Sequence, residues 1–431
     1  MIRDEEPNDT IIHETLLKDP LGRNEQMNTF LGLLNSITKN ATIAIDGDWG
    51  SGKTIFVKQI EYLSRKSSEG IDMLSDTTIE SFRKNYDVYY FNAWENDYHK
   101  DPLQSLLFSL INDTWSLREK VGDKVVKLTK GLKRSITKVA TLGVIDAEQI
   151  DKAENISSLA KDINTASERK QAVDDILKNY LDITGKRLLF IVDELDRCRP
   201  TYAVNLLEVV KHYYNDERIV FLLSTNNQQL SHTIRKVYGQ SFDGPAYLNK
   251  FYDLIFNLPD LEPKSYIKYL GYKTDGGYWK DTAPIEVVEF LGFNIRQINR
   301  YYSSLKLIED FFETTNMFVD DDYSHQLVKF VLIPLAYGLR IKSSDEYDKF
   351  VSGKSKALIQ EFYHSSSTLE ILSQKMKSDT DERQPEEVLI ELYERVLDKK
   401  ISQSRENYRY IEGGRTFKKV VLLMNAAGKI D

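Results

Sequence analysis

The chain has 431 residues, of which 41% are hydrophobic and 11% aromatic, and its formal net charge at pH 7 is −8. This composition excludes a largely disordered protein, the length favours two or three domains, and the acidic balance argues against a surface that coats nucleic acid throughout. The single cysteine, Cys198, excludes an intrachain disulfide and a zinc site built from cysteines, and it favours a reducing compartment.

The first segment in chain order, residues 1–18, is predicted to be a polar lead-in. Its acidic start, MIRDEEPNDT, does not resemble a signal or transit peptide. No stretch reaches the roughly 18 apolar residues that span a bilayer. The longest apolar stretch, Val328–Leu339, contains Pro334 and Gly338 and is predicted to be a buried helix. These features predict a cytoplasmic protein without a transmembrane span.

A phosphate-binding loop is predicted between a strand and a helix in residues 43–60, IAIDGDWGSGKTIFVKQI. Four residues separate Gly47 from Gly52, and Lys53 and Thr54 follow, which is the G-x-x-x-x-G-K-[ST] pattern in its expected context. The glycines let backbone N–H groups turn toward phosphate oxygens, and the helix start adds partial positive charge. Lys53 is expected to contact the β- and γ-phosphates, and the Thr54 hydroxyl to bind Mg²⁺. The predicted nucleotide-binding residues of this loop are Gly47, Asp48, Trp49, Gly50, Ser51, Gly52, Lys53, Thr54 and Ile55.

Upstream of this loop, Asp19–Arg23 predicts a turn that leads into a helix. Apolar residues with helical spacing follow, at Met27, Phe30, Leu31, Leu33 and Leu34. In many P-loop ATPases such a segment lies against the adenine base, so Arg23 is a candidate nucleotide contact. An ordinary surface position for Arg23 is the alternative.

The next predicted strand, Tyr86–Phe91, runs into the polar sequence Asn92–Asp97. Open α/β sheets place functional groups at the carboxyl ends of their strands, which favours a functional cluster here. The alternative is that Trp94 packs in the core while Asn96 and Asp97 cap a helix that begins near Pro102.

A basic amphipathic helix is predicted over Arg118–Lys138, which contains eight basic and two acidic residues. Its apolar residues recur at steps of three and four. Such a helix binds a membrane surface, a nucleic-acid backbone or an acidic partner, or it packs on its own protein with a solvated lysine face. The mixed-charge residues 146–176 are compatible with the return arm of a helical hairpin.

The second strong motif is Arg187–Pro200, RLLFIVDELDRCRP, which predicts a buried strand followed by two acids. On a strand next to the phosphate loop, Asp193 is expected to hold Mg²⁺ and Glu194 to accept a proton from the attacking water. Arg197 and Arg199 are expected to form ion pairs within the chain or to reach a neighbouring subunit.

Two later features are candidates for contact with the γ-phosphate. Asn226 follows the strand Ile219–Ser224 and is predicted to bond the γ-phosphate or the lytic water, or else its own turn. After Tyr247–Pro259 the pattern is helical, and Arg296 and Arg300 lie on one face of a predicted helix. These arginines are expected to act from a helical lid, with a salt-bridged surface as the alternative.

Together, GDWGSGKT, FNAWEND, DELDRCRP and YLNKFYDLIFNLP resemble the motifs of the KAP-type P-loop NTPases, over roughly residues 15–310. These belong to the additional-strand, catalytic-glutamate division that also contains the AAA+ and STAND ATPases. The resemblance implies an α/β fold, a P-loop NTPase three-layer sandwich with a mainly parallel sheet, a helical insertion and a C-terminal all-α region. The predicted domains are a core of 1–117 and 171–262, an insertion of 118–170, and a lid and helical domain of 263–431.

The resemblance also implies roles for single residues. Asp193 takes the position of the metal-site carboxylate, Glu194 that of the catalytic glutamate, and Asn226 that of the sensor. Arg296 or Arg300 takes that of the lid arginine. The family usually has paired aspartates where this chain has Asp193 and Glu194, and often an aspartate at the position of Asn226.

The predicted function is an ATPase that binds ATP and Mg²⁺ and drives a conformational or assembly switch, in bacterial anti-phage defence or signalling by resemblance. The alternative is a nucleotide-gated scaffold with little turnover that binds membrane, nucleic acid or a partner through its basic helix. Many family members carry membrane helices between the phosphate loop and the acidic strand, where this chain has Arg118–Lys138. Self-association or a partner protein, and a peripheral membrane contact through this helix, are therefore expected.

Overall fold

The computed structural model describes residues 7–66, 70–99, 101–103, 105–106, 109–110, 166–213, 216–274, 279–315, 326–376, 382–397, 416–422 and 424–425. It divides into two compact units. The first is Met1–Asp19 with Arg23–Asp260, and the second is Pro20–Gly22 with Leu261–Asp431. The predicted basic helix Arg118–Lys138, and most of the predicted insertion, lie outside the described residues.

The first unit contains a parallel sheet of five strands in the order β2-β3-β4-β1-β5. The strands are β1 (Ala41–Asp46), β2 (Tyr86–Asn92), β3 (Arg187–Asp193), β4 (Ile219–Thr225) and β5 (Leu254–Asn257). All predicted strands are present, and the predicted parallel sheet is confirmed. β4 lies between β3 and the phosphate-loop strand β1, an order that the sequence did not indicate.

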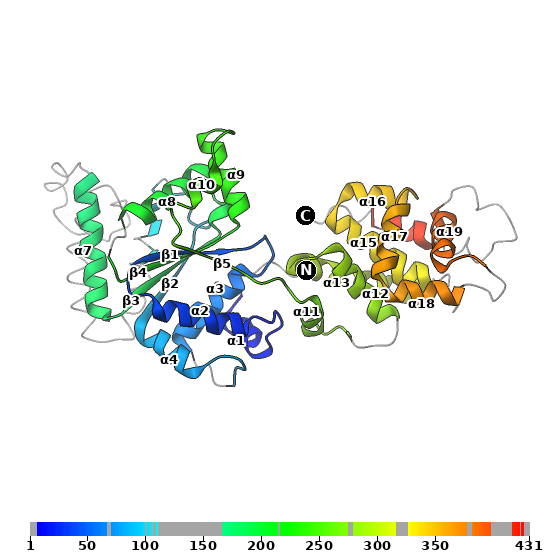
Figure 1. Cartoon of the computed structure of the whole chain (residues 1–431), viewed down its shortest axis with the longest axis horizontal. Coiled ribbons are helices and arrows are strands. Elements are labelled where there is room, and N and C mark those ends of the chain that lie inside the picture. The colour runs from blue at the N-terminus through cyan, green and yellow to red at the C-terminus, as the bar shows by residue number, and fades with distance from the viewer. Residues whose placement is uncertain are drawn as a thin grey trace. The chain divides into compact units, whose positions relative to one another are not determined.

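Helices cover both faces of this sheet (Figure 1). One face packs against α1 (Asp9–Lys18), α2 (Asn24–Ser36), α3 (Lys53–Arg65) and α4 (Asp76–Asn85). The other packs against α7 (Ala166–Thr184), α8 (Pro200–Tyr213), α9 (Asn227–Tyr238) and α10 (Gly244–Leu248). This is the predicted three-layer sandwich.

The apolar run of β3 serves both faces at once. Leu189 and Ile191 belong to the core beneath α1–α4, while Leu188, Phe190 and Val192 belong to the core beneath α7–α10. Successive side chains of a strand point to opposite faces, so a strand covered on both sides must be apolar without alternation.

An aromatic cluster fixes the helix that follows the phosphate loop. The ring centroid of Phe56 in α3 lies 5.8 Å from that of Phe30 in α2 and 5.9 Å from that of Phe256 in β5. The Phe30 and Phe256 centroids are 4.9 Å apart. Such aromatic pairs contribute about 0.5–1.5 kcal/mol each beyond the apolar area that they bury. The start of α3 is therefore held by a rigid core.

Helices α1, α4, α9 and α10 of the first unit are not among the predicted elements. The prediction of a polar lead-in over residues 1–18 is wrong, because α1 buries Ile12 and Leu16 and its first turn is capped by the Asn8 side chain. Helix α4, capped by Ser75, was likewise not predicted.

The described part of the second unit is helical, as predicted for the C-terminal region. Its helices are α11 (Pro263–Tyr269), α12 (Trp279–Leu291), α13 (Ile295–Thr315), the π-helical turn η4 (Val328–Leu332), α15 (Ile333–Lys342), α16 (Ser344–Val351), α17 (Lys356–Ser365), α18 (Ser367–Met376) and α19 (Pro385–Leu397). The predicted buried helix Val328–Leu339 corresponds to η4 and α15, with Pro334 in the first turn of α15. A Cβ at Gly338 would lie 2.7 Å from Leu291 Cδ1, so a larger residue there would require the Leu291 side chain in α12 to shift. Among the described residues, no helix has both the length and the apolar character that crossing a membrane requires.

Candidate functional site

The strand ends of the first unit bring the predicted functional residues to one edge of the sheet. Asp46 of β1 is in register with Thr225 of β4, and Asn92 of β2 with Asp193 of β3. Because the strands are parallel, the residues that follow each of them emerge on the same side.

The phosphate loop connects β1 to α3 through glycines with left-handed backbone angles. Gly50 has φ 80° and Gly52 has φ 94°, values that side chains with a Cβ rarely adopt. Helix α3 begins at Lys53, so its first N–H groups border the loop. This combination of glycines and helix start is the geometry that binds phosphate groups in other proteins.

Lys53 bends back onto the loop that it follows. Its Nζ donates to the carbonyl oxygens of Gly47, at 2.6 Å, and Asp48, at 3.1 Å. Burial lowers the pKa of Lys53, and neighbouring carboxylates, Asp196 foremost, oppose this. A buried ammonium group that donates to neutral carbonyl oxygens can exchange these hydrogen bonds for stronger, charge-assisted ones to an anionic ligand.

Asp193 ends β3 as a buried carboxylate, only 1% exposed. Its oxygens accept hydrogen bonds from the Glu194 backbone N–H, at 2.9 Å, and from the Tyr90 hydroxyl, at 3.2 Å. Burial raises the pKa of Asp193 despite the hydrogen bonds that it accepts. Sequence reasoning missed Tyr90, whose position in a core strand gave no functional signal. The Lys58 ammonium lies over the Tyr90 ring, 3.3 Å from its centroid.

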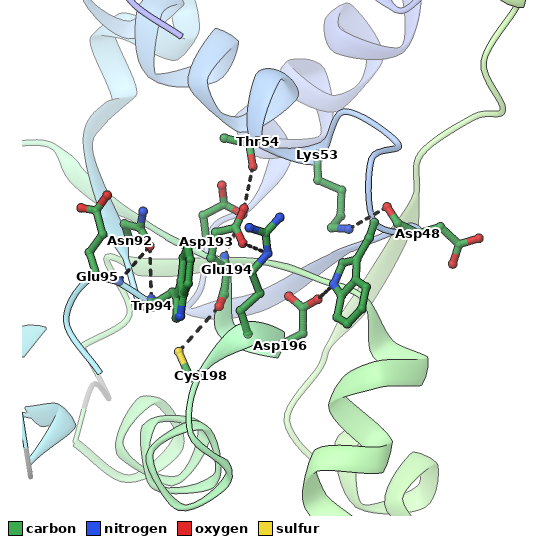
Figure 2. A network of polar contacts seen from close by, with 12 residues as sticks. Asp48, Lys53, Thr54, Asn92, Trp94, Glu95, Asp193, Glu194, Asp196 and Cys198 are labelled. Carbon is green, nitrogen blue, oxygen red and sulfur yellow. Dashed lines mark hydrogen bonds and ion pairs between the residues drawn. The ribbon is translucent and has the colours of Figure 1, made fainter. Parts of the chain in front are cut away.

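Glu194 has a left-handed backbone, with φ 63°, which costs a residue with a side chain about 1–2 kcal/mol. Its carboxylate pairs with Arg197 and accepts a 3.4 Å hydrogen bond from the Thr54 hydroxyl (Figure 2). Burial and the neighbouring Asp193 raise the pKa of Glu194 to about 7, while Arg197 opposes the rise. The Glu194 carboxylate thus faces the start of α3 across the sheet edge.

Two exposed tryptophans flank these acids. The Trp49 indole N–H, in the phosphate loop, donates to Asp196, and the residue is 43% exposed. The guanidinium of Arg197 lies 5.6 Å from the centroid of the Trp94 ring. Trp94 is 51% exposed, so the expectation that it packs in the core is wrong.

Two other residues of the Asn92–Asp97 cluster, Asn92 and Asp97, accept hydrogen bonds from backbone N–H groups. The Asn92 side chain accepts hydrogen bonds from the backbone N–H groups of Trp94 and Glu95 (Figure 2). The predicted helix cap is also wrong for Asp97, which instead accepts from the Arg199 backbone N–H at 2.9 Å and pairs with its side chain. Arg199 and Arg197 therefore both form ion pairs within the chain, the first of the two expectations for them.

Asn226 lies between the phosphate loop and α9. Its Nδ2 donates to Asp48 Oδ1 at 3.2 Å, and its Oδ1 accepts from the Gln229 backbone N–H at 3.0 Å, which caps α9. Next to it, the Asn227 backbone N–H donates to Asp46 at 2.8 Å. The alternative that Asn226 bonds its own turn is confirmed by this cap, while its contact with the γ-phosphate or the lytic water stays a prediction.

Arg23 is buried, so the expectation of a surface arginine is wrong. Only 3% of it is exposed, and its guanidinium donates to the carbonyl oxygens of Ser51 and Pro259. Arg296 and Arg300 lie on α13 of the second unit, and their role at the nucleotide stays a prediction.

Comparison with known proteins gives one match in sequence. Residues 23–319 match the KAP family P-loop domain. No curated protein matches the chain. Among solved structures, the Aeropyrum pernix ORC2 protein in its ADPNP–ADP complexes is 13% identical and is aligned over 98% of this chain and 97% of that one. The TM-score of 0.29 is too low to support a statement about fold or function.

Proposed function

Because the chain belongs to the KAP family of P-loop domains, we propose that it binds Mg²⁺-ATP and hydrolyses it to drive a conformational or assembly switch. The observation that carries this proposal is the contact between Thr54 and Glu194. It joins the end of the phosphate loop to the acidic strand end at 3.4 Å. A nucleotide at the loop then has a proton acceptor beside its terminal phosphate.

The phosphates are held by the loop itself. Lys53 exchanges its present carbonyl partners, Gly47 and Asp48, for phosphate oxygens. The N–H groups of the loop and of the first turn of α3 complete the anion site.

The residues present fit a magnesium ion. Thr54 offers a hydroxyl and Asp193 a buried carboxylate, and Mg²⁺ prefers such oxygen ligands together with phosphate oxygens and water. When bound, the ion neutralises charge that develops on the transferred phosphoryl group. The Tyr90 hydroxyl and the Glu194 backbone N–H orient the Asp193 carboxylate.

Glu194 takes the proton of the attacking water in this proposal. Burial and Asp193 raise its pKa to about 7, which suits a group that accepts a proton near neutral pH. Asn226 contacts Asp48 in the loop and acts as the sensor of the terminal phosphate. The biological setting that we propose, anti-phage defence or signalling, rests on the family alone.

One observation favours a second candidate, a nucleotide-held switch with little turnover. The Glu194 carboxylate pairs with Arg197, and this pair must open before Glu194 can act on water. Nucleotide binding without hydrolysis requires the phosphate loop but does not require that Glu194 leave its ion pair with Arg197.

The proposal is tested by equilibrium binding of Mg²⁺-ATP to the wild type, Lys53→Ala and Lys66→Ala. Lys66 is an exposed residue at the other end of α3 and serves as the control for loss of one positive charge. Loss of a charge-assisted hydrogen bond predicts about 10- to 100-fold weaker binding for Lys53→Ala and wild-type binding for Lys66→Ala. Equal affinity of the wild type and Lys53→Ala would contradict a nucleotide site at this loop.

A further inference from the structure

Arg23 connects two segments that are distant in the sequence. Its Nη1 donates to Ser51 O, in the phosphate loop, at 2.7 Å, and its Nη2 donates to Pro259 O at 2.8 Å. Pro259 lies just before Asp260, after which the chain leaves the first unit. One side chain thus links the loop to the segment by which the chain exits this unit.

Burying the Arg23 guanidinium costs free energy, and hydrogen bonds fix its position. Buried arginines are rare, because the guanidinium loses its hydration. Burial lowers the pKa of Arg23, and the carboxylates of Asp19 and Asp260 oppose this. The Arg23 backbone N–H also donates to Asp19, at 2.7 Å, which fixes the start of α2. These contacts hold the Arg23 guanidinium in one orientation toward the Ser51 and Pro259 carbonyl oxygens.

The bond to Ser51 constrains the peptide that joins Ser51 to Gly52. In a planar trans peptide, the carbonyl oxygen and the following N–H point in opposite directions. With the Ser51 oxygen turned to Arg23, the Gly52 N–H points away from the guanidinium. Gly52 is the residue before α3, and its N–H belongs to the set that cradles phosphate in loops of this sequence pattern.

We propose that Arg23 is a positioning residue of the phosphate site: it holds the Ser51–Gly52 peptide with the Gly52 N–H toward the bound phosphate and ties this loop to Pro259. This inference rests on the proposed nucleotide site and assigns Arg23 to the phosphates. A contact between Arg23 and the base, the role expected from the sequence, predicts a different pattern of ligand affinities.

Inorganic tripolyphosphate distinguishes the two roles because it has phosphates and no base. Binding of Mg²⁺-ATP and of Mg²⁺-tripolyphosphate is measured for the wild type, Arg23→Ala, Arg23→Lys and the control Arg187→Ala. Arg187 also donates from one guanidinium to two backbone carbonyls, Lys39 O at 2.6 Å and Glu217 O at 3.1 Å. It does so at the amino end of β3, on the opposite edge of the sheet.

Arg23→Ala is expected to weaken both ligands by the same factor, about 10-fold, since one charge-assisted bond positions the loop for each of them. Arg23→Lys retains a charge and one donor group and is expected to lose less, while Arg187→Ala binds as the wild type does. Circular dichroism and unfolding midpoints establish that each variant is folded. If Arg23→Ala does not fold, Arg23→Lys carries the comparison.

Two results would overturn the positioning role. One is a loss of ATP affinity with unchanged tripolyphosphate affinity, which assigns Arg23 to the base. The other is unchanged affinity for both ligands in folded Arg23→Ala. If the wild type binds neither Mg²⁺-ATP nor Mg²⁺-tripolyphosphate, the proposed function itself is contradicted.

Discussion

At the scale of single residues, Trp49 is an intrinsic fluorescent probe within the candidate site. Trp49 lies within the phosphate loop and is 43% exposed, and its indole N–H donates to Asp196, which follows β3. In the proposed complex Lys53 exchanges its carbonyl partners for the ligand, so we expect the loop to rearrange when phosphate binds. We therefore expect the Trp49 indole to change both its hydrogen bond and its exposure.

We predict a change in tryptophan emission that saturates as Mg²⁺-ATP is added. Trp49→Phe is expected to remove this change, and Trp94→Phe to retain most of it, because Trp94 contacts Arg197 and not the loop. The measurement is a fluorescence titration of the three proteins. A change that persists in Trp49→Phe would show that the signal arises from another of the four tryptophans.

Sequence could predict some residue positions and not others, for a physical reason. Lys53 and Thr54 have fixed places in a local motif, so their position follows from spacing alone. Tyr90 and Arg23 act through the folded chain: Tyr90 reaches Asp193 across neighbouring strands, and Arg23 reaches Pro259, which is 236 residues away. Nothing near either residue in the sequence indicates these partners.

At the scale of elements, Asn226 at the start of α9 makes two contacts with one side chain. The Asn226 oxygen caps the helix and its amide nitrogen contacts Asp48. A substitution by alanine therefore removes both contacts at once. Serine is a good helix cap but has no amide to reach the loop.

We predict that Asn226→Ala lowers the free energy of unfolding by about 1 kcal/mol, whereas Asn226→Ser leaves it nearly unchanged. Both variants are expected to hydrolyse ATP about 10- to 100-fold more slowly, since both lose the donor at the phosphate side. Denaturant unfolding and phosphate release measure the two quantities separately. Wild-type turnover in Asn226→Ser would leave Asn226 only its capping role.

The strands were more predictable than the short helices. The apolar runs of β1, β3 and β4 indicate their burial directly, and the polar residues after them mark the functional edge. Helix α1 was missed because its ten residues are mostly polar and bury few side chains, so its pattern resembles a surface segment. The order of the strands is not a local property, which is why the place of β4 between β1 and β3 was not foreseen.

At the scale of the whole molecule, the chain has a nucleotide unit and a helical unit, each with its own packed elements. The fold class and family follow from four motifs spread over the first of these units. The second unit contains helices without a catalytic pattern, so sequence predicts its class and not its contacts. The domain limits and the lid arginines, Arg296 and Arg300, remain predictions.

The proposed function predicts an enzyme whose turnover drives the switch and rises with protein concentration through self-association. In that proposal Glu194 and Lys53 supply the chemistry and other parts of the chain supply the assembly. A nucleotide-held switch shares the binding site and lacks the turnover. The two candidates therefore differ in one measurable rate.

That rate is steady-state phosphate release from Mg²⁺-ATP by the wild type, Lys53→Ala, Glu194→Gln and the control Glu217→Gln, at several protein concentrations. Glu217 is exposed at the opposite edge of the sheet, before β4, and undergoes the same chemical change. We predict loss of turnover in Lys53→Ala, a fall of about 100-fold or more in Glu194→Gln, and wild-type turnover in Glu217→Gln. Turnover per subunit is expected to rise with protein concentration. Undiminished turnover in Glu194→Gln, or tight Mg²⁺-ATP binding without any turnover in the wild type, would contradict the account.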